Sequence, residues 1–330
     1  MEYEGQICRA PQERASFMLP IMVGCSYNRC KFCNLFRHLD FRVLPLEQVE
    51  AELARVRSVG GKPKKVFLGD GNAFDLPMSH LEKVIGLIHE YLPDCSAINM
   101  DATVTGIGRK TDEELAWLAQ AGVSHLYLGI ESGLDDVLEF MDKDHRNDGA
   151  RCAIHRIQEA GMHFDAHIMT GIAGAGRGEE NARALAAFLN ETHPAHVVNF
   201  SLFLHEEVPL FQEIREGRYR AASEGENVRE EILLLQLLCE GMDENRPIKY
   251  EGFHDFLGCR VSGMLPKDGP KMIGKLEKLL ADHLEADKTY SFVRGECPVL
   301  FTQDGKVIYS TTLPGEYGTR LPKGPLCAVV

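Results

Sequence analysis

The sequence predicts an α/β fold in which a partial (β/α)6 TIM-like barrel precedes a C-terminal extension of helices and a hairpin. Apolar strand-like runs alternate with amphipathic helical segments from about residue 17 to residue 203, as in βα units around a parallel sheet. Beyond this region the alternation fades. We therefore expect a barrel core over residues 1–205 and an extension over residues 206–330 that closes the barrel and lines the substrate site.

The first half of the barrel is predicted from three strand-like runs and the helical stripes between them. Residues 17–24 form an apolar run, and residues 65–68 and 96–101 resemble the next two strands. A stripe from Leu46 to Val56 stops at two glycines that suit a helix C-cap, and a second stripe runs from Leu81 to Leu92. These segments give strand and helix in strict alternation.

The second half continues the same alternation. Thr111 with Glu114 three residues later is the pattern of a capping box, and it predicts a helix that ends near Gly122. The remaining helix of this half is rich in alanine, and the next strands are predicted over residues 125–130, 163–170 and 196–202. No internal repeat accompanies these units, so they share architecture without sharing residues.

The extension carries weaker signals. Helical segments are expected near residues 228–242 and 270–286, and a hairpin near residues 299–309 has its turn at Asp304 and Gly305. An aromatic and ionisable cluster at residues 252–260 fits no helical stripe, and we expect it to line the open side of the barrel.

Composition limits the possible partners. The chain has 330 residues, of which 44% are hydrophobic and 26% charged, as in an ordinary globular protein. Its formal net charge of −13 repels phosphate backbones, so we expect no nucleic acid partner. No apolar stretch approaches the roughly 20 residues that span a bilayer, and the first residues carry no basic and apolar leader pattern. We expect a cytoplasmic protein without a membrane partner.

Three cysteines in one loop are the most informative feature. Cys25, Cys30 and Cys33 follow the first apolar run with the spacing Cys-x4-Cys-x2-Cys. Three thiolates can hold three irons of a [4Fe–4S] cube and leave the fourth iron open to a ligand. Alternatively, the same cysteines with His38 provide four ligands for a structural zinc ion. The other seven cysteines lie singly along the chain and suit small buried hydrophobic positions.

These residues resemble the radical S-adenosylmethionine (SAM) superfamily, with a core similar to its coproporphyrinogen-oxidase and tRNA-methylthiotransferase branch. The commonest spacing there is Cys-x3-Cys-x2-Cys, so this chain carries a variant with one more residue in the loop. Further motifs agree in order. By resemblance, the residues that contact the cofactor are Phe32 before the last cysteine, Gly69, Asp70 and Gly71 for the amino group, Glu131 and Ser132 for the ribose, and Ile168 and Gly171 for the adenine.

The resemblance implies the cofactors and the chemistry. The cofactors are a [4Fe–4S] cluster and SAM, and a flavodoxin or ferredoxin supplies an electron. SAM is then cleaved to a 5′-deoxyadenosyl radical that abstracts hydrogen from a substrate. The three cysteines would be both metal ligands and catalytic residues. From the residues alone, Glu131 also suits a structural cap for a helix that begins near Leu134.

The substrate is predicted only by class. The polar residues that we expect to line its site are mostly acids, amides and histidines: Asn99, Asp101, Asn199, Ser201, His205 and His254. Such a lining suits a small, nitrogen-rich molecule, either an amino compound or a modified purine-like base, that is cleaved by a lyase or oxidised by an oxidoreductase. Asp101 and His205 also suit loop caps, and His254 suits a structural role. The alternative function is a non-enzymatic iron–sulfur or zinc module that senses redox state or metal.

Overall fold

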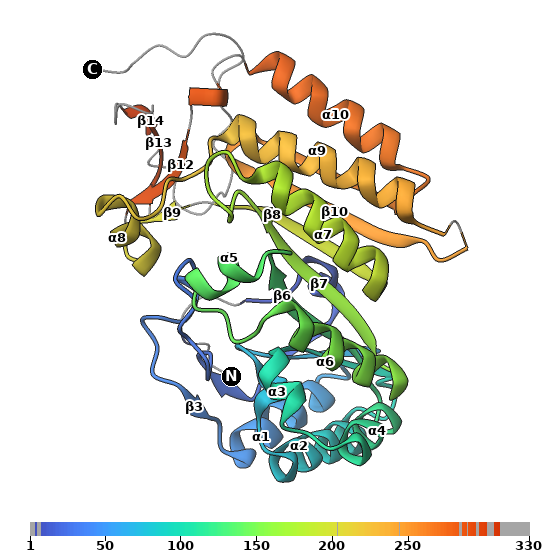
Figure 1. The fold of residues 1–330 in the computed structure, drawn as a ribbon. Helices are drawn as coiled ribbons and strands as arrows, with labels where there is room; N and C mark the ends of the chain where they lie inside the picture. The colour runs from blue at the N-terminus through green and yellow to red at the C-terminus, as the bar shows by residue number, and fades with distance from the viewer. Residues whose placement is uncertain are drawn as a thin grey trace. The chain divides into compact units, whose positions relative to one another are not determined.

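The structure is a computed structural model that describes residues 4, 8–202, 204–243, 245–283, 286–288, 290–294, 297–301 and 307–310. The chain divides into two compact units. The first unit comprises Met1–Gly129 with Asp148–Asp165, and the second comprises Ile130–Asn147 with Ala166–Val330. Figure 1 shows the ribbon and labels many of its helices and strands.

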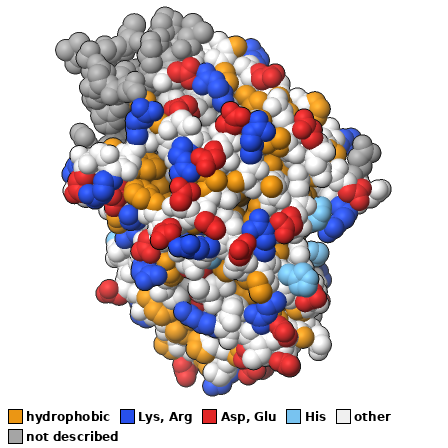
Figure 2. All heavy atoms as spheres, in the orientation of Figure 1, with side chains coloured by type: hydrophobic (Ala, Val, Ile, Leu, Met, Phe, Trp, Pro, Cys, Tyr) orange, Lys and Arg blue, Asp and Glu red, His pale blue; other side chains and the backbone are white. Residues whose placement is uncertain are grey.

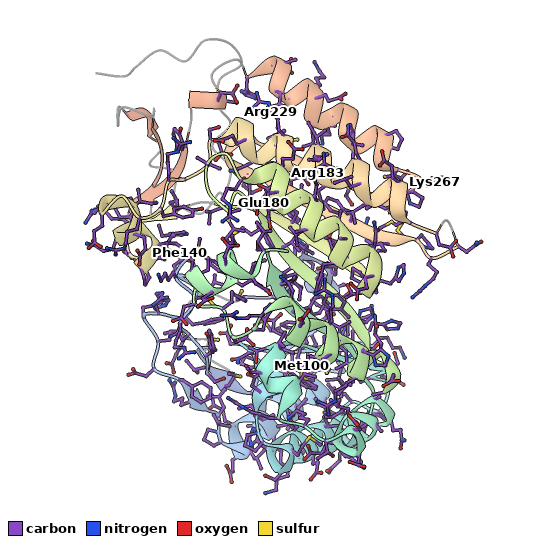
Figure 3. The ribbon with its side chains drawn as sticks, in the orientation of Figure 1. Met100, Phe140, Glu180, Arg183, Arg229 and Lys267 are labelled. Atoms are coloured by element: carbon purple, nitrogen blue, oxygen red, sulfur yellow. The ribbon has the colours of Figure 1, made fainter. Side chains whose placement is uncertain are left out.

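The first unit is built on parallel strands. Leu68 lies in strand β4 (Lys65–Gly69) and pairs with Leu19 on one side and with Met100 on the other. Met100 in turn pairs with Leu126. All four side chains are fully buried, so one apolar row crosses the strands. Figure 3 labels Met100 in this row. The strands are β1 (Phe17–Pro20), β4 (Lys65–Gly69), β5 (Ala97–Ala102) and β6 (Val123–Glu131), and the last two residues of β6 belong to the second unit.

Helices and short elements complete the first unit. The expected capping box is confirmed, because the Thr111 hydroxyl accepts the Glu114 N–H while the Glu114 carboxylate accepts the Thr111 N–H. The helices are α1 (Leu46–Ser58), α2 (Met78–Tyr91), α3 (Val104–Gly108), α4 (Asp112–Gln120) and α6 (Asn147–Glu159), with the short elements η1 (Pro11–Ala15), β2 (Met22–Val23), β3 (Arg42–Val43) and η2 (Ala73–Asp75).

The second unit contains the later strands and a layer of packed helices. Figure 1 shows α7, α9 and α10 side by side, and α9 packs against both of the others. The larger strands are β7 (His163–Thr170), β8 (His196–Ser201), β10 (Ile248–His254) and β11 (Cys259–Leu265), and the first three residues of β7 belong to the first unit. The helices are α5 (Asp135–Phe140), α7 (Gly178–Thr192), α8 (Pro209–Arg215), α9 (Glu224–Gly241) and α10 (Gly269–Asp282), with η3 (Asp255–Leu257) and η4 (Ala286–Lys288).

The α/β fold class is confirmed, and the strand series is longer than expected. Hydrogen bonding orders the large sheet β1-β4-β5-β6-β7-β8-β10-β11. Strand β10 is parallel to β8, and β11 is antiparallel to β10. The sequence hides β10 because Lys249 and Glu251 interrupt its apolar residues, whereas in the structure every second residue from Ile248 to His254 is buried. This period of two is the pattern of a strand with one buried face and one partly exposed face. The predicted division at residue 205 stays a prediction.

The expected hairpin lies in a second, smaller sheet. Strands β13 (Cys297–Phe301) and β14 (Val307–Ser310) pair antiparallel, as predicted, and the expected turn lies outside the described residues. The sheet is completed by β12 (Tyr290–Arg294) and β9 (Leu204–His205), in the order β14-β13-β12-β9.

The surface carries mixed charge. On the face shown in Figure 2, acidic and basic side chains lie among one another. On α7, for example, Arg183 pairs with Glu179 at 2.9 Å, and Glu180 pairs with Arg177 at 2.9 Å. Figure 3 labels Glu180 and Arg183 on this helix. Among the described residues, the helices are all too short or too polar to cross a membrane.

Candidate functional site

The cysteine loop follows β2 directly and is folded by its own hydrogen bonds. Cys25, Cys30 and Cys33 are all partly buried. The N–H of Asn28 donates to the Sγ of Cys25 at 3.5 Å, and the N–H of Cys33 donates to the carbonyl of Cys30 at 3.2 Å. The Asn28 side chain donates to the carbonyl of Phe36 at 3.1 Å. The loop therefore has a defined path that brings three thiols to one segment.

Arg37 ties the backbone of this loop together. Its Nε donates to the carbonyl of Cys33 at 2.7 Å, and its terminal nitrogen donates to the carbonyls of Cys30 at 2.5 Å and Arg29 at 3.2 Å. A guanidinium presents several donors in one plane, so a single side chain can bind three carbonyls. Arg37 therefore fixes the spacing of two of the three cysteines.

The loop after β4 packs on the cysteine loop. A Cβ on Gly71 would lie 2.4 Å from the carbonyl oxygen of Gly24, and Gly71 has φ +128°, so only glycine fits there. Asn72 lies in the same loop and is buried. The N–H of Ser26 donates to Asn72 Oδ1 at 2.9 Å, and Asn72 Nδ2 donates to Ser26 Oγ at 2.8 Å. The structure thus brings the predicted Gly-Asp-Gly segment against the predicted cluster loop.

Two carboxyls of the first unit have raised pKa values. Asp70 is 2% exposed, and burial raises its pKa to about 6, although the N–H of Cys8 donates to it at 3.4 Å and opposes the shift. Burial also raises the pKa of Asp101 to about 7, with further contributions from Glu13 and Asp70. Such carboxyls exchange protons near neutral pH, which is a property of many active sites.

Asn99 is held by protein partners. Its Nδ2 donates to Glu13 Oε1 at 2.8 Å, and its Oδ1 accepts the N–H of His125 at 3.0 Å. Glu13 is itself buried and also accepts the hydroxyls of Ser16 and Tyr127. This network explains why a fully buried amide is tolerated at Asn99.

Glu131 lies in the second unit, at the end of β6. It has φ +63°, which is rare for a residue other than glycine, and such backbone conformations concentrate at functional sites. Its carboxylate pairs with Lys143 Nζ at 3.4 Å, and both side chains are largely buried. The alternative role as a helix cap gains no support, because α5 begins at Asp135 after Leu134 without a side-chain cap hydrogen bond.

Ser132 and Gly171 are bound to neighbouring helices. The hydroxyl of Ser132 donates to Asn181 of α7 at 2.7 Å and accepts the N–H of Leu134 at 3.1 Å. The N–H of Gly171 donates to Glu230 of α9 at 2.8 Å. Ile168, three residues earlier on β7, is fully buried. These contacts hold both segments in place through protein atoms alone.

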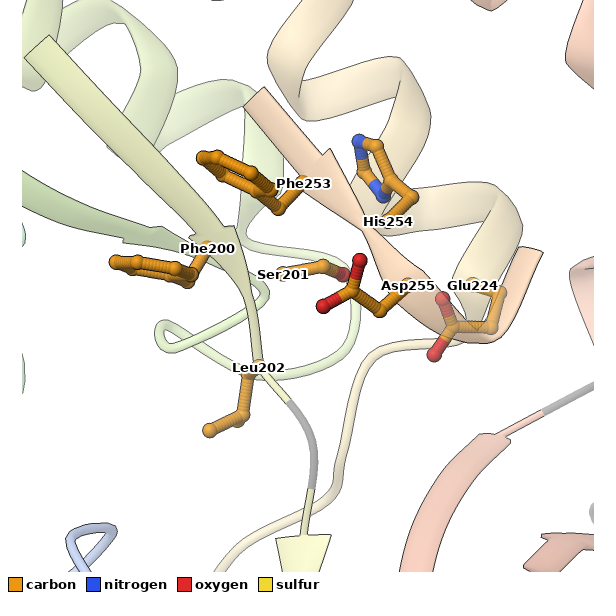
Figure 4. Close-up of a pocket in the computed structure, with 7 residues that line it drawn as sticks. All are labelled: Phe200, Ser201, Leu202, Glu224, Phe253, His254 and Asp255. Atoms are coloured by element: carbon orange, nitrogen blue, oxygen red, sulfur yellow. The ribbon is translucent and has the colours of Figure 1, made fainter. Parts of the chain in front are cut away.

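Ser201 and His254 meet in a small pocket at the ends of β8 and β10. Figure 4 shows its lining, which consists of Phe200, Ser201, Leu202, Glu224, Phe253, His254 and Asp255. Burial alone would lower the pKa of His254, but the Glu231 carboxylate that contacts its Nε2 outweighs this effect and raises the pKa. The neighbouring Phe200 and Phe253 rings are stacked with centroids 5.3 Å apart.

The other two predicted substrate residues of the second unit differ in surroundings. Asn199 is fully buried, and its Oδ1 accepts the N–H of Thr170 at 3.1 Å. His205 is partly buried on β9, and burial lowers its pKa to about 4, so its imidazole is neutral near pH 7.

Comparison with known proteins identifies the family of this chain. Residues 19–189, just over half of the chain, match the family model described as the radical SAM superfamily. The chain belongs to the radical SAM superfamily. The chain is also 22% identical over 226 residues to the heme chaperone HemW of Bacillus subtilis (strain 168), and the match covers 65% of this chain and 58% of HemW.

Solved structures of radical SAM proteins share the fold. Coproporphyrinogen III oxidase (HemN) from Escherichia coli is similar with a TM-score of 0.54 at 12% identity, over 90% of this chain and 71% of HemN. Methylornithine synthase (PylB) is similar with a TM-score of 0.52 at 15% identity, over 92% of this chain and 77% of PylB. These similarities confirm the barrel-like architecture and do not extend to substrates.

The family's cofactors are a [4Fe–4S] cluster and SAM, and the cysteine loop fits the cluster. It offers three partly buried thiols on one segment and a backbone N–H directed at the sulfur of Cys25. Among the described residues, no three His, Cys, Asp or Glu side chains are already gathered as metal ligands, and this holds for a cluster and for a zinc ion alike.

Sequence reasoning missed several residues that position the site. These are Arg37 and Asn72 beside the cysteine loop, Lys143 beside Glu131, and Asn181 and Glu230 behind Ser132 and Gly171. Asn72 directly follows the Gly-Asp-Gly motif, and that adjacency was a usable signal. The others lie 4 to 59 residues from their partners in the chain, and no local pattern points to them.

Proposed function

We propose that this radical SAM protein is an enzyme that uses a [4Fe–4S] cluster and SAM to remove hydrogen from a small polar, nitrogen-rich substrate. The observation that carries the proposal is the cysteine loop, which is locked through Asn72 to the loop that follows β4. When bound, the two cofactors supply a 5′-deoxyadenosyl radical after one-electron reduction. The residues of this chain bind, orient and shield the reactants around that chemistry.

We assign cofactor roles to the residues of the motifs. Cys25, Cys30 and Cys33 hold three irons, and Phe32 shields the cluster from solvent. The loop Gly69, Asp70 and Gly71 holds the SAM amino group, because a buried carboxylate suits an ammonium ion. Binding this cation lowers the pKa of Asp70 again and stabilises its charged state. Glu131 accepts from the ribose hydroxyls, Ser132 shapes that segment, and Ile168 and Gly171 contact the adenine.

The substrate is an amino compound or a modified purine-like base. Asp101 suits a role in proton exchange with a nitrogen of the substrate, because its pKa lies close to physiological pH. In the second unit, Ser201 and His254 line one pocket and offer a hydroxyl and an imidazole. His205 is a neutral imidazole, and Asn99 and Asn199 hold neighbouring backbone in place. The outcome is bond cleavage by a lyase or oxidation by an oxidoreductase.

We further propose a flavodoxin or ferredoxin as electron donor, and a cytoplasmic location. A reaction in which SAM is cleaved needs one electron from outside the chain, and small electron carriers deliver it in the reducing cytosol.

The proposal is tested by SAM cleavage. Protein purified without oxygen should be brown and contain about four irons per chain. With dithionite and SAM it should release 5′-deoxyadenosine, whereas the triple variant Cys25→Ala, Cys30→Ala, Cys33→Ala should not. Colourless, zinc-loaded protein that leaves SAM intact contradicts the proposal.

A non-enzymatic binding module is the second candidate. It is favoured by the similarity to a protein described as a heme chaperone, although this chain spans only 58% of that relative. In this case the protein keeps its cluster and binds heme. Adding candidate amines then never raises its rate of SAM cleavage above the rate without them. Heme titration followed by absorbance separates the two candidates.

A further inference from the structure

A chain of buried hydrogen bonds links the two predicted SAM-binding segments of the second unit. The ribose segment is Glu131–Gly133, and the adenine turn is Ile168–Gly174. Asn181 Oδ1 accepts the Ser132 hydroxyl at 2.7 Å and the Gly133 N–H at 3.1 Å. Asn181 Nδ2 donates to Glu230 Oε1 at 2.6 Å, and Glu230 Oε2 accepts the Gly171 N–H at 2.8 Å.

The backbone donors at both ends fix the direction of donation along this series of hydrogen bonds. A backbone N–H can only donate, so the N–H of Gly133 holds the Asn181 amide with its oxygen toward the ribose segment. The amide nitrogen then faces Glu230, whose other oxygen receives the N–H of Gly171. The Asn181 amide has one orientation that satisfies its partners, because reversing it places its nitrogen against the Gly133 N–H and its oxygen against the Glu230 carboxylate.

These hydrogen bonds lie in the protein interior, so losing one of them is costly. Asn181 and Ser132 are 0% exposed and Glu230 is 3% exposed. A buried polar group that loses its partner is costly because water cannot replace it. The backbone around it has no spare room, since a Cβ on Gly133 would lie 2.4 Å from the N of Leu185.

Other contacts hold the adenine turn against α9. Gly171 has φ +84°, and a Cβ there would lie 2.2 Å from the side-chain oxygen of Asn227. The hydroxyl of Tyr219 donates to the carbonyls of Gly171 at 2.9 Å and Ile172 at 3.1 Å. The Tyr219 ring stacks on Phe140 at the end of α5, with centroids 5.8 Å apart, and Figure 3 labels Phe140. The turn is therefore clamped from both its N–H and its carbonyl side.

We propose that Asn181 and Glu230 are positioning residues that set the spacing between the ribose segment and the adenine turn, and thereby the affinity for SAM. The inference rests on the proposed function, because it takes these two segments as SAM-binding. Neither residue contacts SAM itself. Each acts through the backbone that it holds, so a change at α9 is felt at a ribose segment nearly one hundred residues earlier in the chain.

The test uses a variant and its reciprocal rescue. Glu230→Gln places an amide nitrogen against a donor. We therefore expect the dissociation constant for SAM, measured by calorimetry of the anaerobically reconstituted protein, to increase at least tenfold. Adding Asn181→Asp restores the bond between the two side chains with reversed polarity, because the introduced carboxylate accepts from the introduced amide. The bonds from Ser132, Gly133 and Gly171 keep their direction. The double variant should return to within about threefold of the parent.

Glu231→Gln is the matched control. Glu231 is the next residue on α9 and equally buried, but its partners are Tyr250 and His254. This variant should keep the parent's SAM affinity. Hydrogen exchange of the protein without SAM provides a second readout. Glu230→Gln should accelerate exchange both in peptides that cover residues 131–134 and in those that cover residues 169–174, whereas Glu231→Gln should not.

The outcomes separate this inference from the proposed function. If the parent fails to bind SAM, the proposed function is wrong, and the exchange data still show whether the two segments are coupled. If the parent binds SAM and Glu230→Gln binds equally well, the positioning role is wrong. If Glu230→Gln does not fold, the double variant decides: recovery of fold and affinity supports the inference, and continued failure overturns it.

Discussion

Asn72 and Ser26 are joined by two hydrogen bonds of opposite direction, one of 2.9 Å from the Ser26 N–H and one of 2.8 Å to the Ser26 hydroxyl. The pair joins the loop after β4 to the residue that follows Cys25. Ser26, the residue next to the proposed cluster ligand Cys25, is therefore held by a side chain 46 positions away in the chain.

The first prediction concerns this pair. Asn72→Ala removes both bonds and should loosen the cysteine loop, so that a chelator bleaches the visible absorbance of the cluster several times faster than in the parent. Ser58→Ala removes an exposed hydroxyl that binds only the carbonyl of Arg55 in the described structure, and it should leave the rate unchanged. Equal rates for the parent and Asn72→Ala would show that the loop needs no such support.

The second prediction concerns the cluster ligands. Cys30→Ala should abolish iron binding and leave the circular dichroism of the barrel intact, because Cys30 lies in a surface loop. Cys95→Ala and Cys239→Ala should keep the iron and cost only a small cavity. Iron content and circular dichroism of the three variants decide the matter, and equal iron loss from all three means that the ligands are assigned wrongly.

Much of the fold was predictable because the early strands are continuous apolar runs. Val66, Phe67 and Leu68 are all fully buried, as a strand in the middle of a parallel sheet requires. Strand β10 escaped prediction because charged residues alternate with its buried ones. A search for burial at every second residue from Ile248 to His254 would have predicted this strand.

The candidate site could be predicted where its residues stand next to one another in the chain. The cysteine loop and the Gly-Asp-Gly motif are local patterns. The partners of Gly171 and Ser132 are not, because they come from α9 and α7 and lie 59 and 49 residues away in the chain, respectively. Glutamate side chains are seldom buried, whereas the structure buries Glu230 almost fully.

The third prediction separates cofactor residues from substrate residues. Glu131→Ala removes a charged acceptor from a largely buried position, which typically costs about 1.5–3 kcal/mol, or roughly a tenfold to hundredfold loss in SAM affinity. Asp70→Ala should act similarly through the amino group. Calorimetric titration of both variants with SAM measures the effect, and parent-like affinity of Glu131→Ala would refute its ribose role.

Asp101→Ala provides the contrast to those variants. It should bind and cleave SAM as the parent does, because we place it toward the substrate, but it should impair turnover once the substrate is known. If Asp101→Ala weakens SAM binding as much as Asp70→Ala does, then Asp101 belongs to the cofactor site. Parallel titrations of these two variants distinguish the assignments.

The fourth prediction concerns pH and stability. An unfolded glutamate releases its proton near pH 4.5, whereas burial raises the pKa of Glu230 to about 8. Between these values the native state binds more protons than the unfolded state, so the free energy of unfolding falls as pH rises. Asp101, with a pKa of about 7, acts in the same direction. His205 acts in the opposite direction, but only between about pH 4 and 6.5.

The measurement is therefore made above that range. Urea unfolding of the cluster-free protein should show stability falling from pH 6.5 to 8, by at most about 1.4 kcal/mol per pH unit for each such carboxyl. Glu230→Gln removes one of these groups and should reduce the slope. A stability that rises over this interval would contradict the raised pKa values of the buried carboxyls.

The fifth prediction tests the central claim most directly: that Cys25, Cys30 and Cys33 hold a cluster whose open iron binds SAM. The measurement is the electron paramagnetic resonance spectrum of the dithionite-reduced protein before and after addition of SAM. We predict the signal of a reduced [4Fe–4S] cluster, with a line shape that changes when SAM is added. A cluster signal that SAM leaves unchanged, or no cluster signal at all, would contradict the account.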